Sequence, residues 1–184
     1  MASMVRSLMP DGWEGIDLLD VGVGDGYTIR LLKPEGRVTG IDIDRESVTS
    51  AKERGIDAHE GSVYRIPFLD RSFGLVTCME VLEHLEQPKD ALKEIVRVLR
   101  PGGYVVVTTP IPSWKWNATW WVWSKFGPGR RWETTPHVSD LHMKERPGED
   151  GDLQTLFKEL GCKVLKMEKC NLGMVAGLQA TKAL

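Results

Sequence analysis

The stretch from Leu18 to Gly26, LLDVGVGDG, combines an apolar strand, a glycine-rich turn and two carboxylates. Three glycines at alternate positions let the main chain turn sharply and leave the backbone bare for a ligand. Asp20 closes the strand and Asp25 lies inside the turn, so a pyrophosphate would meet two negative charges where it needs bare amides. The loop is also GxGxG, not GxGxxG. It therefore favours a cationic nucleoside over a nucleotide, and a purely structural turn stays open.

Another carboxylate, Asp42, ends the short β-branched run RVTGID. At the tip of a strand, a carboxylate can accept two hydrogen bonds from a cis-diol, as the same position does for ribose in dinucleotide sites. Asp42 or its neighbour Asp44 could instead cap the helix that follows. The sequence thus predicts a ribose contact at Asp42, with helix capping as the alternative.

Alternating strands and helices position these groups. We expect strands at residues 16–21, 37–42, 56–60, 73–79, 104–109, 163–170 and 174–181, and helices at 27–32, 46–54, 88–100 and 152–160. The short link between the last two strands makes that pair antiparallel. The pattern predicts an α/β fold with a doubly wound, mostly parallel seven-stranded sheet and an antiparallel last strand. Ligands bind such sheets beyond the carboxyl ends of the strands, so Asp20, Asp42 and Met79 should ring one cleft.

Length and composition narrow the class of protein. The 184 residues fit a single domain, 1–184, and the 24 basic and 26 acidic residues give no reason to expect general nucleic-acid binding. The three cysteines lack metal-type spacing, so we expect no disulfide and no metal site. No apolar run has the length of a signal peptide core or a transmembrane segment. We therefore expect a cytoplasmic protein.

With these pieces placed, the chain resembles the class I S-adenosylmethionine-dependent methyltransferases, in particular their small-molecule, methyltransferase type 11-like group. The resemblance rests on LLDVGVGDG, GIDID, PFLDRSF, CMEVLEHL and LRPGG in that order, and it covers residues 16–103 closely. The antiparallel last strand matches the family's seventh strand. The resemblance implies a Rossmann-like enzyme that transfers a methyl group from S-adenosyl-L-methionine to a small acceptor without a metal.

The resemblance also implies a set of cofactor-binding residues. The glycine loop would contact the methionine part of the cofactor, and Asp42 would bind the ribose hydroxyls. Ile43 would lie on one face of the adenine, with Ser62 and Val63 along its edge. The predicted set consists of Asp20, Gly22, Val23, Gly24, Gly26, Asp42, Ile43, Ser62, Val63, Met79 and Glu80.

Within this set, Met79 and Glu80 would form the floor near the donor methyl. Two positions depart from the family pattern. Ser62 stands where an acid usually receives the adenine amino group, and Gly74 stands where Asp often follows Phe73. A serine hydroxyl can still accept that hydrogen bond, more weakly by about 1 kcal/mol.

Six of the seven tryptophans fall between Trp114 and Trp132. Relatives insert substrate-binding elements there, and we expect a Trp-rich insertion at 110–147. Trp116, Trp120 and Trp123 share one helical stripe, which suits a helix over an apolar or aromatic acceptor. Core packing or a subunit contact is the alternative. Peripheral membrane contact is a third, because the insertion carries six basic and three acidic residues.

Three histidines are candidates for a general base. His137 comes first, because relatives often carry a histidine facing the substrate in that place, and His142 comes next. His84 lies within EVLEHL, where a packing or capping role is equally compatible with its position. Each of the three stays a candidate catalytic residue at this point.

Few residues precede the first strand, where relatives commonly carry helices folded over the cofactor. We therefore expect either an open cleft or a second chain, as a homodimer or a partner subunit. Two other function classes stay open: a non-catalytic S-adenosylmethionine-binding partner subunit, and an NAD-binding oxidoreductase. The loop spacing, Asp25 and the antiparallel last strand disfavour the oxidoreductase.

Overall fold

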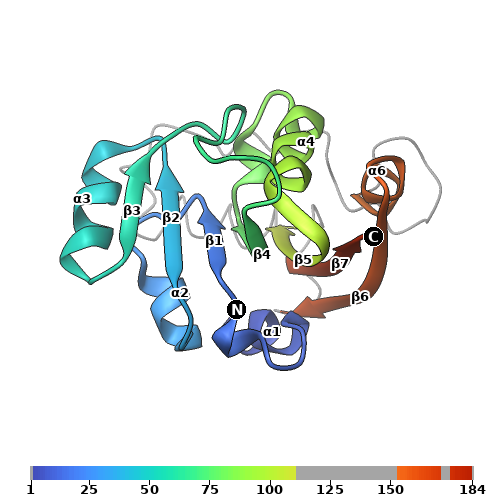
Figure 1. Ribbon diagram of the computed structural model, residues 1–184, viewed down its shortest axis with the longest axis horizontal. Helices are drawn as coiled ribbons and strands as arrows, with labels where there is room; N and C mark the ends of the chain where they lie inside the picture. The colour runs from blue at the N-terminus through green and yellow to red at the C-terminus, as the bar shows by residue number, and fades with distance from the viewer. Residues whose placement is uncertain (1, 111–152, 171–174, 184) are drawn as a thin grey trace, which may run out of the picture.

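A computed structural model describes residues 2–110, 153–170 and 175–183 of the chain (Figure 1). Its strands are β1 (Leu18–Val21), β2 (Val38–Asp42), β3 (Asp57–Glu60), β4 (Phe73–Met79), β5 (Leu99–Pro110), β6 (Cys162–Cys170) and β7 (Val175–Lys182). Its helices are α1 (Ala2–Leu8), α2 (Tyr27–Leu32), α3 (Arg45–Glu53), α4 (Pro88–Val98) and α6 (Leu153–Glu159), with short 3-10 turns η1 (Trp13–Gly15) and η2 (Leu82–His84).

The seven strands form one sheet in the order β3-β2-β1-β4-β5-β7-β6. Neighbouring strands from β3 through β5 run parallel, whereas β7 pairs antiparallel with both β5 and β6. This arrangement confirms the predicted doubly wound sheet with an antiparallel last strand. The strand order reverses between β1 and β4, so the connections that follow these two strands leave toward opposite sides of the sheet and open a crevice at their carboxyl ends, where such folds bind ligands.

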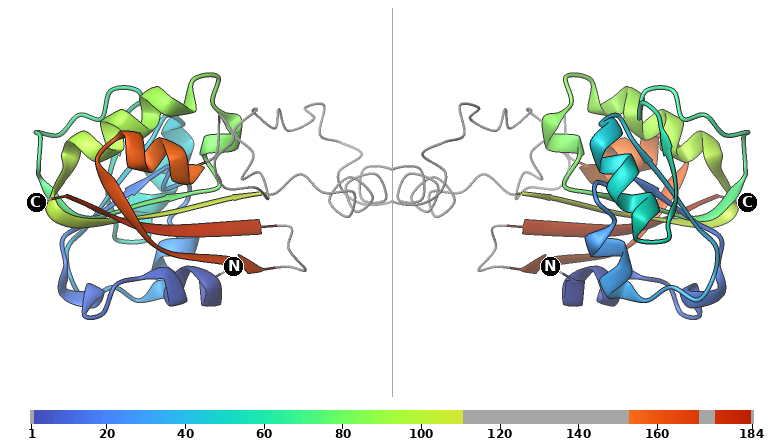
Figure 2. Two further views of the ribbon diagram at one scale, coloured as in Figure 1. Left: turned by 90° about the vertical axis from the view of Figure 1, so that its right-hand side faces the viewer. Right: turned by 90° about the vertical axis from the view of Figure 1, so that its left-hand side faces the viewer.

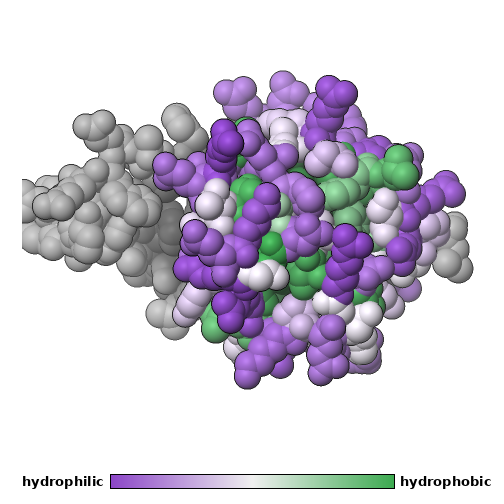
Figure 3. All heavy atoms as spheres, turned by 60° about the vertical axis from the view of Figure 1, so that its left-hand side comes forward, coloured by the Kyte–Doolittle hydropathy of each residue, from purple (hydrophilic) through white to green (hydrophobic). Residues whose placement is uncertain are grey.

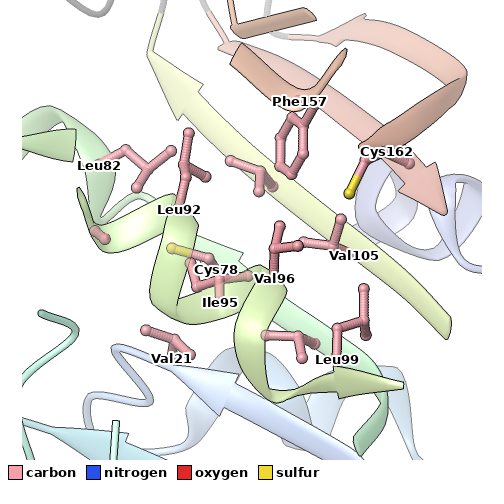
Figure 4. Packing of buried hydrophobic residues seen from close by; sticks show 14 of the residues in the cluster. Val21, Cys78, Leu82, Leu92, Ile95, Val96, Leu99, Val105, Phe157 and Cys162 are labelled. Carbon is pink, nitrogen blue, oxygen red and sulfur yellow. The ribbon is translucent and has the colours of Figure 1, made fainter. Parts of the chain in front are cut away.

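Two hydrophobic layers cover the two faces of the sheet. Leu18 packs in the layer formed with α1, α2 and α3, whereas its neighbour Leu19 packs in the layer formed with α4 and α6. This alternation is the period of two that a strand imposes on its side chains. Figure 2 shows α4 and α6 on one side of the sheet and α1 on the other. Figure 4 shows the α4 layer in detail, with the labelled residues Leu92, Ile95, Val96, Cys78, Val105 and Phe157 packed together.

The boundary between α4 and β5 differs from the prediction. The sequence predicted a helix to residue 100 and a strand from 104, but α4 ends at Val98 and β5 begins at Leu99. The register with β4 jumps from the pair Phe73 and Leu99 to the pair Leu75 and Tyr104. Pro101 and two glycines follow Leu99, so the chain cannot continue as a helix and bulges within the strand instead.

Helix α1 was not predicted from the sequence. Its Met4, Val5 and Leu8 are buried, and the helix crosses β7 at Gly177. A Cβ on Gly177 would lie 2.3 Å from Leu8 Cδ1, so the absent side chain lets the helix approach the sheet. No residue of α1 lines the cleft described below. The segment before β1 therefore covers a face of the sheet.

The surface that carries α2, α3 and the edge strand β3 is dominated by hydrophilic side chains, with a smaller apolar area near its centre (Figure 3). Asp57 on β3 forms an ion pair with Arg37 at 3.0 Å, and its other carboxylate oxygen lies 2.9 Å from His59 Nε2. Charged side chains on an edge strand oppose pairing with other chains. Among the described residues, no helix is long and apolar enough to cross a membrane.

Candidate functional site

A cleft of about 540 Å³ opens at the carboxyl ends of β1, β2 and β4, within the size range of small-molecule sites. Asp42 stands at the end of β2 on one side of it, and Glu80 follows β4 on the other. The described residues that line it are Val21, Gly22, Ile41, Asp42, Ile43, Gly61, Ser62, Val63, Tyr64, Met79, Glu80, Val81, His84, Leu85 and Glu86. The predicted convergence of the ends of β1, β2 and β4 on one cleft is thereby confirmed, with Val21 of β1, Asp42 of β2 and Met79 of β4 in the lining.

The glycine loop after β1 is shaped mainly by packing within the protein. A Cβ on Gly22 would lie 2.2 Å from Val81 Cγ2, and one on Gly26 would lie 2.3 Å from Ile56 Cδ1. Both glycines have positive φ angles, 75° and 77°. Only Gly24 of the three faces open space among the described residues. The missing side chains of Gly22 and Gly26 make room for Val81 and Ile56, and of these two glycines only Gly22 is among the described residues that line the cleft.

Asp42 joins the glycine loop to the end of β2. Its Oδ2 accepts a hydrogen bond from the Gly24 N–H at 2.8 Å, and its Oδ1 accepts one from the Asp44 N–H at 2.9 Å. Each carboxylate oxygen has a further lone pair for a ligand hydroxyl. Asp44 caps α3, because its Oδ2 accepts from both the N–H and the hydroxyl of Ser47. The capping alternative thus holds for Asp44, while Asp42 faces the cleft.

Asp20 lies beneath the cleft with only 2% of its surface exposed. The Thr77 hydroxyl donates a hydrogen bond to its Oδ1 at 2.6 Å. Burial raises the pKa of Asp20 to about 7, the Thr77 hydrogen bond offsets part of that rise, and the negative charge of Asp42 adds to it. The expectation that Asp20 rings the cleft is wrong, because Asp20 does not belong to the described lining residues; the end of β1 lines the cleft through Val21.

A loop between β3 and β4 forms the wall opposite the glycine loop. It contributes Gly61, Ser62, Val63 and Tyr64 to the lining. The Ser62 hydroxyl accepts a hydrogen bond from the Tyr64 N–H at 3.2 Å, and the Tyr64 hydroxyl accepts one from the Gln87 N–H at 3.2 Å. These contacts fix the start of the loop beside the cleft.

The second half of this loop is anchored to α4 by Arg97. The guanidinium donates to the carbonyls of Ile66 and Phe68, each at 2.9 Å, and to Asp70 at 2.7 Å. Glu94 accepts two further bonds from Arg97 and one from the Ile66 N–H. Hydrogen bonds from Arg97 are the main cause that lowers the pKa of Glu94. Helix α4 therefore anchors the loop that forms this wall of the cleft, although no residue of α4 is among the described lining residues.

Glu80 lies in the cleft with an unusual backbone. Its φ angle is 56°, and its N–H donates to the Thr108 carbonyl at 3.0 Å. A non-glycine residue in this region costs about 1 kcal/mol or more. Its Oε1 is buried without a hydrogen-bond partner among the described residues. Burial raises the pKa of Glu80, and the nearby Thr108 hydroxyl offsets part of this rise.

Next to Glu80, the turn η2 pairs an exposed histidine with a buried acid. His84 lines the cleft with 59% of its side chain exposed, whereas Glu83 is 5% exposed. The His84 Nε2 lies 3.9 Å from Glu83 Oε1. Burial raises the pKa of Glu83 to about 8. His84 is therefore a solvent-facing group backed by an acid, which differs from a packing histidine.

The structure brings together most of the predicted cofactor residues. Those that line the cleft are Gly22, Asp42, Ile43, Ser62, Val63, Met79 and Glu80, whereas those in or beneath the loop are Asp20, Val23, Gly24 and Gly26. His137, His142, Trp116, Trp120 and Trp123 lie outside the described residues.

Several lining residues were missed from the sequence, among them Tyr64, Val81, Leu85 and Glu86. Tyr64 gave a usable signal, because an aromatic residue two positions after Ser62 falls within the loop that follows β3. Val81 gave none, since its role depends on the close approach of Gly22 from another strand.

Comparison with known proteins decides the family. Residues 19–107 match the family model described as "Methyltransferase domain". Residues 19–107 belong to the class I S-adenosylmethionine-dependent methyltransferase family. A probable S-adenosylmethionine-dependent methyltransferase of Mycolicibacterium smegmatis is 36% identical over 135 residues, which cover 71% of this chain and 48% of that protein. A ubiquinone biosynthesis O-methyltransferase of Idiomarina loihiensis is 31% identical over 115 residues, 56% of this chain and 47% of that one.

A likeness in fold extends further than the likeness in sequence. The putative methyltransferase of Haloferax volcanii, solved in complex with the Trm112 methyltransferase activator, superposes with a TM-score of 0.77 at 19% identity. That match covers 100% of this chain and 89% of the solved one, and at this identity it shows the fold alone. The chain described in this structure spans less than half the length of the Mycolicibacterium and Idiomarina relatives.

The lining residues fit the family's cofactor, S-adenosylmethionine. Its adenosine carries a cis-diol and its sulfonium carries a positive charge. The Asp42 carboxylate is exposed to the cleft with lone pairs free for a diol. Among the described lining residues there is no lysine or arginine, while three carboxylates are present: Asp42, Glu80 and Glu86. The donor set therefore suits a cation with a sugar and does not suit a diphosphate.

Proposed function

We propose that this chain transfers the methyl group of S-adenosylmethionine to a small, apolar or aromatic acceptor. The observation that carries the proposal is the Asp42 carboxylate, which is fixed to the glycine loop at the edge of a cleft that lacks lysine and arginine among its described lining residues. When bound, S-adenosylmethionine supplies an electrophilic methyl group on a sulfonium. The protein's part is to hold and align the two reactants, which supplies much of the acceleration in such reactions.

In this proposal, different residues around the cleft bind different parts of the cofactor. Asp42 binds the ribose hydroxyls, and Ile43 with Val63 holds the adenine. Met79 and Glu80 lie at the end of β4 toward the methyl group. The support is that these side chains, from the ends of β2 and β4 and from the loop after β3, line one cleft.

The acceptor side of the proposal rests on composition and on a relative. Trp116, Trp120 and Trp123 would contact an apolar or aromatic acceptor through one helical stripe. The Idiomarina relative is a ubiquinone biosynthesis O-methyltransferase. Both facts favour an acceptor with a large apolar surface.

A general base is needed only where the acceptor atom arrives protonated, as a phenol does. His84 is the described candidate, because its ring faces the cleft and Glu83 lies behind it at 3.9 Å. His137 and His142 are the remaining candidates. Exchange of each histidine for glutamine in turn would identify the base by the loss of the acidic limb of the rate–pH profile.

A second chain forms part of the proposal. No residue of α1 lines the cleft, and the Haloferax methyltransferase was solved in complex with an activator protein. We propose that a partner subunit or a second copy covers the cofactor. Light scattering of the purified protein, with and without S-adenosylhomocysteine, tests for the second copy.

The deciding experiment uses S-adenosylmethionine labelled on its methyl group. The protein is incubated with fractionated small-molecule extract, and labelled products are separated from the cofactor. Product formation that falls in the Asp42→Ala variant at low S-adenosylmethionine concentration supports the enzyme. Tight binding of S-adenosylhomocysteine with no labelled acceptor would favour a non-catalytic binding subunit. A rise in melting temperature with NAD and none with S-adenosylhomocysteine would favour the oxidoreductase.

A further inference from the structure

Glu80 has a position in the cleft that the binding of ribose and adenine does not explain. It follows the last residue of β4 and lines the same cleft as Asp42, on the side away from β2 and β3. The next residue, Val81, packs into the space left by Gly22, so this turn lies directly against the glycine loop. In the proposed binding mode, the ribose contacts Asp42, the adenine lies toward Ser62 and Val63, and the sulfur substituent extends along Gly22 toward Glu80.

The backbone of Glu80 is held in this position at a cost. Its φ of 56° is a left-handed conformation that non-glycine residues rarely adopt. The hydrogen bond from its N–H to the Thr108 carbonyl fixes the residue to β5. Lys33 and Arg71 are the other described non-glycine residues with positive φ, and neither lines the cleft. Strain of this kind is retained where the surrounding structure needs the side chain in one place.

The carboxylates in and beneath the cleft differ in the hydrogen-bond donors that their oxygens have. Asp42 accepts two backbone N–H groups, and Asp20 accepts the Thr77 hydroxyl. Glu80 has one buried oxygen, Oε1, with no hydrogen-bond partner among the described residues. A buried carboxylate oxygen without a partner is costly unless a cation or a donor approaches it. Among the described lining residues there is no lysine or arginine to do so.

Donor and product differ at one centre. S-adenosylmethionine carries a methyl group and a positive charge on its sulfur, and S-adenosylhomocysteine has a neutral thioether there. Ribose and adenine contacts are the same for both molecules, so they cannot separate donor from product. A carboxylate near the sulfur can, because its interaction energy depends on the charge.

We propose that Glu80 is the residue that makes this site prefer the charged donor over its neutral product, by placing beside the sulfonium a carboxylate that no lysine or arginine of the described lining neutralises. The inference rests on the proposed function, because it requires the cleft to bind S-adenosylmethionine. Loss of the sulfonium charge on methyl transfer then removes the favourable interaction. The affinity of the site for S-adenosylhomocysteine is therefore lower, relative to S-adenosylmethionine, than it would be without Glu80.

The test compares the dissociation constants of three ligands by isothermal titration calorimetry at pH 8. They are S-adenosylmethionine, S-adenosylhomocysteine and sinefungin, in which an amine-bearing carbon replaces the sulfonium. The Glu80→Gln variant keeps the size of the side chain and loses its charge. We expect Glu80→Gln to weaken both cationic ligands about tenfold and to change the affinity for S-adenosylhomocysteine less than twofold.

Two control variants separate this effect from general damage. Asp42→Asn should weaken all three ligands by a similar factor, since all three carry the same ribose. Glu80→Asp retains the charge and should retain the preference for the cationic ligands. Thermal melts of each variant without ligand show that it is folded.

The outcomes distinguish the inference from the function on which it rests. If the wild-type protein binds neither S-adenosylmethionine nor S-adenosylhomocysteine, the proposed function is wrong and the inference is wrong with it. If the wild-type protein binds both ligands and Glu80→Gln changes their affinities by the same factor, or by none, the inference alone is overturned. A selective loss of the cationic ligands supports both.

Discussion

The Asp42 carboxylate accepts a hydrogen bond from the Gly24 N–H at 2.8 Å, and this contact joins the end of β2 to the loop after β1. Its other oxygen accepts from the Asp44 N–H at 2.9 Å. One side chain thus fixes the shape of the loop and presents an acceptor to the cleft. Ligand affinity and loop geometry are therefore coupled through a single carboxylate.

The first prediction follows from this contact. Asp42→Ala should weaken the binding of S-adenosylhomocysteine by about 2 kcal/mol, because it removes charge-assisted hydrogen bonds to the ribose and loosens the loop. Calorimetry measures the change. Asp44→Ala is the matched control: it removes the α3 cap, lowers the free energy of unfolding by about 1 kcal/mol and leaves the dissociation constant unchanged. An unchanged affinity in Asp42→Ala would contradict the placement of the ribose.

A second prediction concerns the glycines of the loop. Gly22→Ala should destabilise the protein by about 3 kcal/mol, because a new Cβ meets the Val81 side chain in a left-handed backbone. Gly24→Ala should cost about 1 kcal/mol, since only the backbone strain applies in open space. Urea denaturation gives both values.

The double variant Gly22→Ala with Val81→Ala tests the cause. If the clash with Val81 accounts for the loss, the two substitutions together should cost clearly less than the sum of their separate effects. Additive losses would show that the damage at Gly22 arises from backbone strain alone.

Much of the fold was predictable from the sequence because its strands are compact apolar runs bounded by turn residues. Residues 73–79 were predicted with the bounds that β4 has, and α2 likewise. Helix α1 was not predicted, because its seven residues, ASMVRSL, are too short to show a period. Its burial depends on Gly177, which is remote in the sequence.

The candidate site likewise contains residues that could be predicted from the sequence and residues that could not. Asp42 was predictable, because a carboxylate at a strand tip in a doubly wound sheet has few other roles. The partners of Gly22 and Gly26, Val81 and Ile56, were not predictable, because they come from other elements and meet the loop only in the folded chain. The burial of Glu83 could not be read from EVLEHL either, since a 3-10 turn places neighbouring residues on different sides.

A third prediction concerns the pH dependence of stability through Asp20. Burial raises its pKa to about 7, well above the value of an exposed aspartate, so the folded protein holds this proton more tightly than the unfolded chain. The resulting contribution to stability is fully present below the unfolded pKa, and it is lost as the pH rises toward 7, by up to about 1.4 kcal/mol per pH unit.

Asp20→Asn cannot ionise and keeps an acceptor for the Thr77 hydroxyl. Its free energy of unfolding should therefore vary less between pH 5 and 7 than that of the wild type, and at pH 8 the variant should be the more stable. Denaturant titrations across this range provide the measurement. Parallel curves for the two proteins would show that Asp20 keeps an ordinary pKa in the folded state.

The last prediction concerns Arg97, which acts on the cleft from a distance. Its guanidinium binds the Ile66 and Phe68 carbonyls, each at 2.9 Å, and so holds the loop that carries Ser62 and Val63. Arg97→Met should lower the free energy of unfolding by about 2 kcal/mol, because two carbonyls and Glu94 lose a charged donor. It should also weaken the binding of S-adenosylhomocysteine severalfold, since the loop proposed as the adenine wall is no longer fixed.

Lys93→Met is the control on the same helix. Lys93 pairs with Asp90 at 2.7 Å, but both side chains are about half exposed, so the pair contributes little. This variant should change neither stability by more than about 0.5 kcal/mol nor ligand affinity. If Arg97→Met lowers stability while the affinity stays at the wild-type value, the loop keeps its shape without Arg97. The anchoring of the adenine wall by α4 would then be wrong.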